Sequence, residues 1–167
     1  MTISLDDTIV GRIERLEARA AIERLMADYA FGCDQKDVLR FLGVFHDDAE
    51  YVGPTGASVG HEAIRESIRP IWQMLPETHH WITNVTVDFT GVDSASGEAH
   101  VITYGREISG AEGFLSAVYR NQYERRNGVW KGTSVALEIQ WFKQVEFGDS
   151  QTAVAPPSFD NNGSAAR

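Results

Sequence analysis

The chain has 167 residues, of which 43% are hydrophobic and 23% charged, and its formal net charge is −9. This length suits one domain with its own hydrophobic core, and the acidic balance argues against a nucleic-acid partner, whose binding draws on Lys and Arg. The single cysteine, Cys33, excludes an internal disulfide. No apolar run approaches the roughly 20 residues that span a bilayer, so we expect a cytoplasmic protein without a membrane partner.

The first third of the sequence predicts helices. Residues 9–33 contain no proline, and apolar side chains recur there at steps of three to five residues, as in an amphipathic helix. A second, shorter helix is expected to start at Asp34 and to run through Phe45 as far as the two aspartates that follow. The next residues, 49–52, predict a short strand.

A third helix is predicted to start near Gly60 and to end at about Leu75. Its apolar positions recur with helical spacing. Pro70 lies inside this segment and predicts a kink or a break there, because proline cannot donate the helical hydrogen bond.

The second half of the sequence predicts strands. Four segments rich in β-branched and aromatic residues follow one another, at 79–89, 98–108, 114–126 and 129–142. Asn127-Gly128, between the last two segments, is the strongest hairpin signal in the chain. Four strands joined by short turns form an antiparallel meander, and helices followed by strands indicate an α+β fold.

We therefore expect a single α+β domain over residues 1–147, a cone-shaped curved antiparallel sheet with about three N-terminal helices. Helices packed on the concave side of such a sheet enclose a pocket for a small molecule. Residues 148–167 are poor in apolar anchors and predict a flexible C-terminal tail. Sheets of this kind expose an apolar face, so a homodimer or homotrimer is expected.

The sequence lacks the common cofactor and metal motifs. It contains no Gly-x-Gly-x-x-Gly, no Walker loop, no Gly-x-Ser-x-Gly elbow and no His-Glu-x-x-His. The five histidines show no i,i+4 pairing, and Cys33 has no second cysteine beside it. We expect neither a metal nor a cofactor.

Asp34 and a pair of histidines are the candidates for chemistry. Asp34 lies where the two predicted helices meet, and an aspartate there also suits a helix N-cap. His79 and His80 open a predicted strand, whose alternation sends their side chains to opposite faces. His80 shares a mixed face with Asn84 and is favoured as the pocket residue, whereas His79 shares with Trp81 a more apolar face that is expected to pack. A β-bulge would invert this assignment.

Four stretches carry a further signal through their order and spacing. They are residues 19–25 (RAAIERL), 45–51 (FHDDAEY), 78–84 (THHWITN) and 121–131 (NQYERRNGVWK). Together they resemble the SnoaL-like, nuclear transport factor 2-like superfamily, and within it the branch of scytalone dehydratase and hexachlorocyclohexane dehydrochlorinase. The resemblance covers roughly residues 12–143. Since this fold hosts enzymes of several classes and non-catalytic modules, it is more specific for fold than for function.

The resemblance implies a catalytic dyad. The Asp of the branch falls on Asp34, and its His, four residues before an Asn, falls on His80. The pocket Arg that the dehydrochlorinase carries on its last strand has no counterpart at residues 134–136. The position of a second pocket His in the dehydratase is closest in spacing to Arg106. With the aromatic residues of the chain, the predicted substrate-binding set is Tyr29, Tyr51, Trp72, Arg106 and Tyr119.

These residues predict a cofactor-independent lyase. A neutral His80 would remove a proton, and Asp34 would hold the ring in the right tautomer and stabilise the imidazolium. The leaving group would depart as water, halide or a carbonyl fragment, and Tyr29, Tyr51 or Arg106 would donate to the developing charge. The many aromatic residues favour an aromatic substrate. The alternatives are an isomerase with the same pocket and a non-catalytic module such as the small subunit of a ring-hydroxylating dioxygenase.

Overall fold

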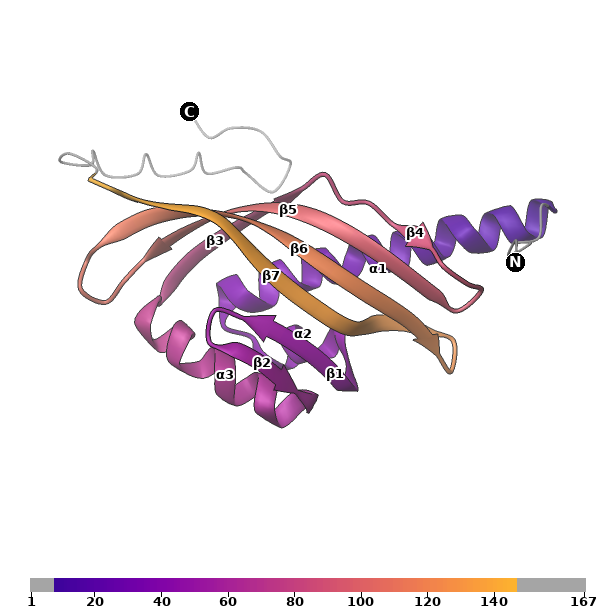
Figure 1. Cartoon of the computed structure of the whole chain (residues 1–167), viewed down its shortest axis with the longest axis horizontal. Coiled ribbons are helices and arrows are strands. Elements are labelled where there is room, and N and C mark those ends of the chain that lie inside the picture. Colours follow the sequence, from indigo (N-terminus) through magenta and orange to yellow (C-terminus); the bar gives the residue numbers. More distant parts are fainter. Residues whose placement is uncertain (1–7, 147–167) are drawn as a thin grey trace, which may run out of the picture.

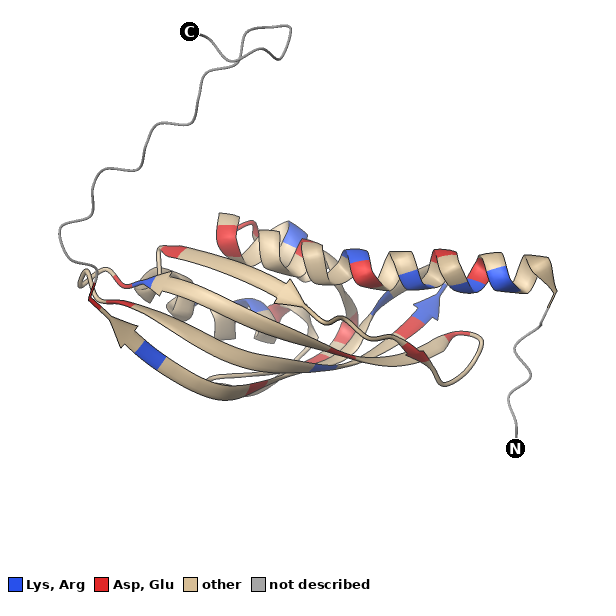
Figure 2. Cartoon of the chain, turned by 90° about the horizontal axis from the view of Figure 1, so that it is seen from above, with Lys and Arg blue, Asp and Glu red and all other residues tan. Residues whose placement is uncertain are grey.

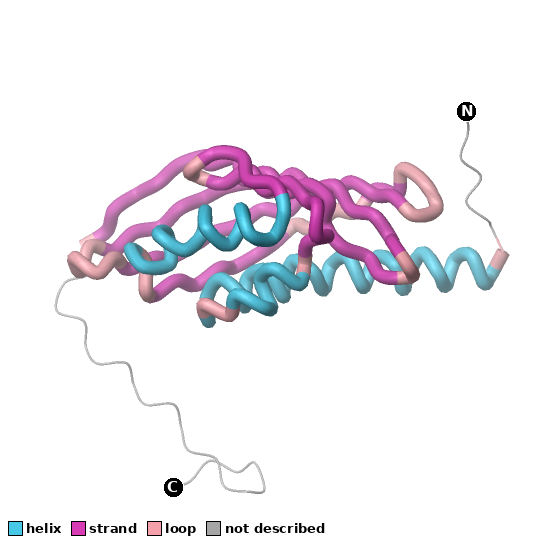
Figure 3. The backbone as a smooth tube through the Cα atoms, turned by 90° about the horizontal axis from the view of Figure 1, so that it is seen from below, coloured by secondary structure: helices cyan, strands magenta, loops and turns pink. Residues whose placement is uncertain are grey.

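A computed structural model describes residues 8–146 of the chain. Three helices cover one face of a curved, seven-stranded sheet (Figure 1), and the view from below shows all three on that same face (Figure 3). The expected α+β class with about three N-terminal helices is confirmed. The predicted tail at 148–167 lies outside the described residues.

Helix α1 (Ile9–Gln35) runs beneath the sheet and extends beyond it at its N-terminal end (Figure 1). It begins after Thr8, whose side chain accepts a hydrogen bond from the backbone N–H of Gly11. The C-terminal half of α1 supplies buried residues such as Ile22 and Tyr29. Acidic and basic residues are interspersed along the helix (Figure 2). Most of the residues that α1 contributes to the core therefore lie in its C-terminal half.

Helix α2 (Val38–Gly43) begins later than predicted, because Asp37 and not Asp34 is its N-cap. The Asp37 side chain accepts from the backbone N–H groups of residues 39 and 40, at 3.1 and 3.0 Å. Asp34 lies inside the last turn of α1. The helix ends at Lys36, whose backbone adopts the left-handed conformation with φ 56°. Gly32 allows the two helices to approach closely, since a Cβ there would lie 2.7 Å from the backbone nitrogen of Phe41.

Strand β1 (Phe45–Gly53) is longer than the predicted strand at 49–52. It begins at Phe45, which the sequence predicts to lie in the second helix. It forms a hairpin with β2 (Gly56–Val59), which leads directly into α3 (Gly60–Met74). Helix α3 continues through Pro70 to its predicted end, so the proline does not terminate it. Strand β1 pairs in parallel with the last strand, and the expectation of a purely antiparallel sheet is wrong at this one pairing.

The remaining strands are β3 (Glu77–Thr83), β4 (Asp88–Phe89), β5 (Ser94–Arg106), β6 (Glu112–Arg126) and β7 (Val129–Val145). The long ones, β3, β5, β6 and β7, form the predicted antiparallel meander. The order across the sheet is β2-β1-β7-β6-β5-β3, and β4 pairs with β5 outside this path. Residues between β5 and β6 and between β6 and β7 form short turns, which agrees with the glycine signals in the sequence.

The predicted strand over 79–89 is interrupted. Asn84 adopts a left-handed backbone conformation, with φ 52°, and the chain pairs again only at β4. This break changes which residues face inward, so that Val85 and Val87 pack whereas Trp81 is 52% exposed. The expectation that His79 and Trp81 share a packed face is therefore wrong.

The hydrophobic core lies between the helices and the concave face of the sheet. Fully burying a large apolar side chain stabilises a fold by about 1.5–3 kcal/mol, so this layer supplies most of the stability. Among the helices of residues 8–146, none is long and apolar enough to span a membrane. The largest fully buried side chains are those of Ile22, Phe41, Phe45, Ile64, Val101, Tyr119 and the polar Asn121.

Candidate active site

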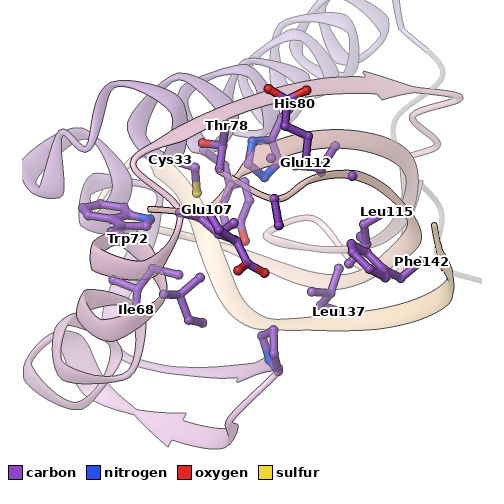
Figure 4. A pocket seen from close by; sticks show the side chains of 18 of the residues that line it. Cys33, Ile68, Trp72, Thr78, His80, Glu107, Glu112, Leu115, Leu137 and Phe142 are labelled. Carbon is purple, nitrogen blue, oxygen red and sulfur yellow. The ribbon is translucent and has the colours of Figure 1, made fainter. Parts of the chain in front are cut away.

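A cavity of about 220 Å³ lies where the helices leave one end of the curved sheet open (Figure 4). Its wall is mostly apolar and combines residues from α1, α3 and the long strands. Side chains that project into it include Cys33, Trp72, Thr78, His80, Leu115 and Leu137. The cavity is thus assembled from segments that are distant in the sequence.

His80 and Asp34 form a hydrogen-bonded pair at the wall of this cavity. The His80 Nδ1 lies 2.5 Å from Oδ1 of Asp34, and the backbone N–H of His80 donates to Oδ2 at 2.9 Å. Because a carboxylate only accepts, Nδ1 carries the proton and Nε2 is left with a free lone pair. The side chain of His80 is 11% exposed and that of Asp34 is 20% exposed. The pair therefore offers a base, held in one tautomer, to a molecule in the cavity.

The pair arises from two local features. Asp34 lies in the last turn of α1, and β3 crosses the end of that helix. Alternation along β3 places Thr78 and His80 on the same side, toward the carboxylate and the cavity. His79 points to the other face, where it is 55% exposed and stacks on Tyr104 with 5.9 Å between ring centroids.

The carboxylate of Asp34 is ionised. Burial would raise the pKa of Asp34, but hydrogen bonds from the ring and backbone of His80, together with Thr78, outweigh burial and hold that pKa below its ordinary value. An ionised carboxylate against Nδ1 stabilises the imidazolium that forms when Nε2 takes up a proton.

Three tyrosines line the cavity beside the pair. The hydroxyl groups of Tyr29 and Tyr51 lie 3.3 Å apart, and the rings of Tyr29 and Tyr119 meet edge to face at 5.1 Å. Burial raises the pKa of Tyr51 to about 12 and raises the pKa values of Tyr29 and Tyr119 well above the ordinary value. All three are therefore neutral phenols near pH 7 and can donate hydrogen bonds.

Four of the five predicted substrate-binding residues line the cavity, namely Tyr29, Tyr51, Trp72 and Tyr119. Arg106 does not. It follows the cavity-lining Gly105 on β5, so its side chain faces the outside of the sheet. Its guanidinium pairs with Glu77 at 3.1 Å and with Glu112 at 2.9 Å, and of these two partners Glu112 also belongs to the cavity lining.

Sequence reasoning missed two carboxylates of the cavity wall. Glu107 and Glu112 flank the turn between β5 and β6, and both line the cavity (Figure 4). Their sequence context of Gly, Ser and Ala indicates only a turn, so no sequence signal separates them from solvent-facing residues. Among the described residues that line the cavity, none is Lys or Arg. Within residues 8–146, no cluster of three or more His, Cys, Asp or Glu could hold a metal ion.

Residues 14–135 match the SnoaL-like domain family. Hexachlorocyclohexane dehydrochlorinase 1 of Sphingobium indicum is 36% identical over 128 residues, which cover 71% of this chain and 79% of that protein.

Solved structures are similar over a larger part of the chain. The crystal structure of a type 2 hexachlorocyclohexane dehydrochlorinase superposes with a TM-score of 0.80 at 29% identity, covering 86% of this chain and 99% of that one. A structure described as a putative scytalone dehydratase from Novosphingobium aromaticivorans has a TM-score of 0.73, covers 87% of this chain and 99% of its own, and is 22% identical. At that identity it supports the fold alone.

Proposed function

The chain belongs to the SnoaL-like domain family, and from this premise we propose that it is a cofactor-independent lyase with a His80–Asp34 dyad. The observation that carries the proposal is the 2.5 Å contact between His80 Nδ1 and Asp34 Oδ1 at the wall of an apolar cavity. A relative that is 36% identical is a dehydrochlorinase, which is a lyase that eliminates HCl. A non-catalytic module would have no need of such a pair.

The proposed reaction is an elimination. The Nε2 atom of His80 removes a proton from a carbon of the substrate, and the electrons of that C–H bond form a double bond to the neighbouring carbon. The leaving group departs from that second carbon with its bonding pair, either as halide or as hydroxide that takes up the proton of the imidazolium to become water. Where a carbonyl fragment is lost instead, Nε2 removes the proton of a hydroxyl group, the C=O bond forms as the neighbouring C–C bond breaks, and the C–C electrons stay on the other fragment, which the imidazolium protonates. Asp34 remains ionised throughout and stabilises the imidazolium until its proton is released.

The three tyrosines are the proposed donors to the charge that develops on the leaving group or on a conjugated oxygen. Neutral phenols that are fixed by packing stabilise such charge without reorganisation. All three residues line the same cavity as His80. Since no Lys or Arg belongs to the described lining and Glu107 and Glu112 do, we propose that the substrate carries no negative charge of its own.

The cavity limits the size of the substrate. An apolar cavity of about 150 Å³ accommodates benzene, so a cavity of about 220 Å³ suits one substituted ring. Trp72 and the tyrosines offer ring faces and edges to such a molecule. We therefore propose a small, neutral substrate that is aromatic or cyclic.

A substrate screen tests this proposal. Halogenated cyclohexanes and cyclic β-hydroxy ketones would be incubated with the purified protein and with His80→Ala, and release of halide or water would be followed by mass spectrometry. We expect at least one compound to be converted by the natural protein and not by the variant. Conversion that persists in His80→Ala would overturn the dyad.

A further inference from the structure

Lys36 occupies an unusual position beside the dyad. It lies two residues after Asp34 and ends α1 with a left-handed backbone conformation, at φ 56° and ψ 29°. This conformation is uncommon for a residue with a Cβ and favours glycine or asparagine. The backbone N–H of Lys36 donates to the carbonyl of Cys33 and satisfies the helix end. Glycine would do this with less strain, so the backbone alone does not require a lysine here.

The side chain of Lys36 turns back toward the dyad. Its Nζ donates to Oγ1 of Thr78 at 2.8 Å, and Thr78 is only 7% exposed. The ammonium also lies 6.0 Å from the ring centroid of Trp72, a residue of the cavity wall. Burial lowers the pKa of Lys36, and the nearby carboxylate of Asp34 acts in the opposite direction. Holding a cation there costs free energy, which its contact with Thr78 partly offsets.

The direction of the Thr78 hydroxyl follows from this contact. An ammonium group can only donate, so Oγ1 of Thr78 must accept from it and must direct its own proton elsewhere. Thr78 acts as a hydrogen-bond donor that lowers the pKa of Asp34. The contact of Lys36 with Thr78 and the contact of Asp34 with His80, together with the influence of Thr78 on the pKa of Asp34, connect the ammonium group to the His80 ring.

We propose that Lys36 is a positioning residue for the dyad. By donating to Thr78 it fixes that hydroxyl as a donor to Asp34, and thereby keeps the carboxylate ionised and oriented toward His80. The role in turnover rests on the proposed lyase function, whereas the effect on the dyad is measurable without a substrate.

The other titratable groups near the dyad differ from Lys36 in charge. Tyr29 and Cys33 face it from α1, and Tyr119 faces it from β6. Burial raises the pKa of each of these three groups, so all are neutral at pH 7. Glu23 of α1 lines a second hollow that also reaches Asp34 and His80. Lys36 is thus the positive group whose removal isolates the effect on the carboxylate.

The experiment follows the Nδ1 proton of His80 by NMR. A short hydrogen bond to a carboxylate places this proton far downfield, and its absence in His80→Ala assigns the resonance. We expect Lys36→Met and Thr78→Val to shift or broaden it and to raise the pH below which it is lost, because both remove support for the ionised carboxylate. Lys36→Arg should restore the natural behaviour, since arginine can donate to the same oxygen.

Lys131→Met is the matched control, because Lys131 lies on β7 next to the hairpin at Asn127-Gly128 and does not line the cavity. Circular dichroism and thermal unfolding verify that each variant is folded. A Lys36→Met protein whose resonance and pH range equal those of Lys131→Met would overturn the proposal.

Once a substrate is identified, kinetics separate this proposal from the proposed function. Lys36→Met should lower kcat by roughly 10- to 100-fold with little change in KM, because misplacement of a catalytic group costs rate. It should also move the acidic limb of the pH profile upward. If the His80 resonance responds to Lys36→Met but the natural protein shows no elimination activity, the proposed lyase function is contradicted and the positioning role of Lys36 stands. An active lyase whose resonance and acidic limb do not respond contradicts the role of Lys36 alone.

Discussion

The two faces of the sheet carry similar residues and use them differently. On the concave face, His80 lies against Asp34 in a wall of buried tyrosines. On the outer face, His79 stacks on Tyr104 and lies 3.6 Å from the exposed Glu77. Two adjacent histidines thus have different surroundings because α1 crosses only one face. The helix that covers the face, more than the residue type, decides which imidazole can act as a base.

Substitution of the two histidines gives the largest expected difference between the faces. His80→Ala should lower the rate of elimination by roughly 10²–10⁴-fold, because the proton acceptor is lost. His79→Ala, the matched variant one residue away, should change the rate by less than about twofold, since its ring is remote from the cavity wall. Single-turnover kinetics of both variants measure this difference. Equal losses in the two variants would show that the faces are not functionally distinct.

Asp34→Asn should also be severe, by at least about 10²-fold in rate. An amide can donate to Nδ1, which favours the wrong tautomer of His80, and it cannot stabilise the imidazolium. The fold should persist, because Asp34 caps no helix and only its contacts with β3 change. Activity at the natural level in the Asn variant would show that the carboxylate is structural.

Much of the fold was accessible from the sequence. The periodicity of 9–33 and the strand-rich second half predicted α1 and the meander, because these elements are long and their patterns repeat. Local backbone effects were not accessible. Nothing in the sequence distinguishes Asp37 from Asp34 as the N-cap, since both aspartates precede the same apolar run. The parallel pairing of β1 with β7 depends on how the whole sheet closes on the helices.

The candidate site shows the same division. Alternation placed His80 toward the cavity, which agrees with the structure, but the companion expectation for His79 and Trp81 failed because Asn84 breaks the strand. Arg106 was predicted to bind substrate from its spacing in the sequence alone. It follows the cavity-lining Gly105 on β5, and because side chains alternate along a strand it faces away from the cavity. The contribution of Lys36 depends on a left-handed helix end, which has no sequence signature when the residue is not glycine or asparagine.

Removal of one phenol should have a smaller effect than removal of the dyad. Tyr51→Phe keeps the ring and deletes a donor 3.3 Å from the hydroxyl of Tyr29. We expect a loss of up to about 10²-fold in kcat, since a donor to developing charge acts mainly in the transition state. Tyr104→Phe is the matched control, because Tyr104 stacks on His79 and does not line the cavity, and it should leave kcat within about twofold. A larger loss in the Tyr104 variant would place the developing charge on the other side of β5.

The lowered pKa of Asp34 predicts a modest effect on stability in acid. A carboxyl group whose pKa is lower in the folded state stabilises the fold above its unfolded pKa, and this contribution is lost as the pH falls through the folded pKa. Asp34→Asn lacks an ionisable group at this position. The free energy of unfolding of the natural protein should therefore fall more steeply below about pH 4 than that of the variant. Urea unfolding at pH 3 and pH 7 measures the difference, and equal pH dependence would contradict the lowered pKa.

Substitutions on the outer face are expected to have the smallest effect on the rate. Two tryptophans of that face lie in one row across the sheet. Trp81 pairs in register with Ile102, and Trp141 follows in the same row after Ser116 of β6. The two tryptophans are 52% and 49% exposed, respectively. Exposed apolar rows of this kind favour self-association, so we predict a homodimer or homotrimer that buries them.

Trp81→Ser with Trp141→Ser should convert that assembly to monomers while kcat per subunit stays within about threefold, because neither side chain lines the cavity. Sedimentation velocity at micromolar concentration, with and without the substitutions, measures the change. A natural protein that is already monomeric would refute the predicted assembly. A dissociated variant with strongly reduced kcat would instead show that assembly supports the concave face, because the two faces share the backbone of the same strands.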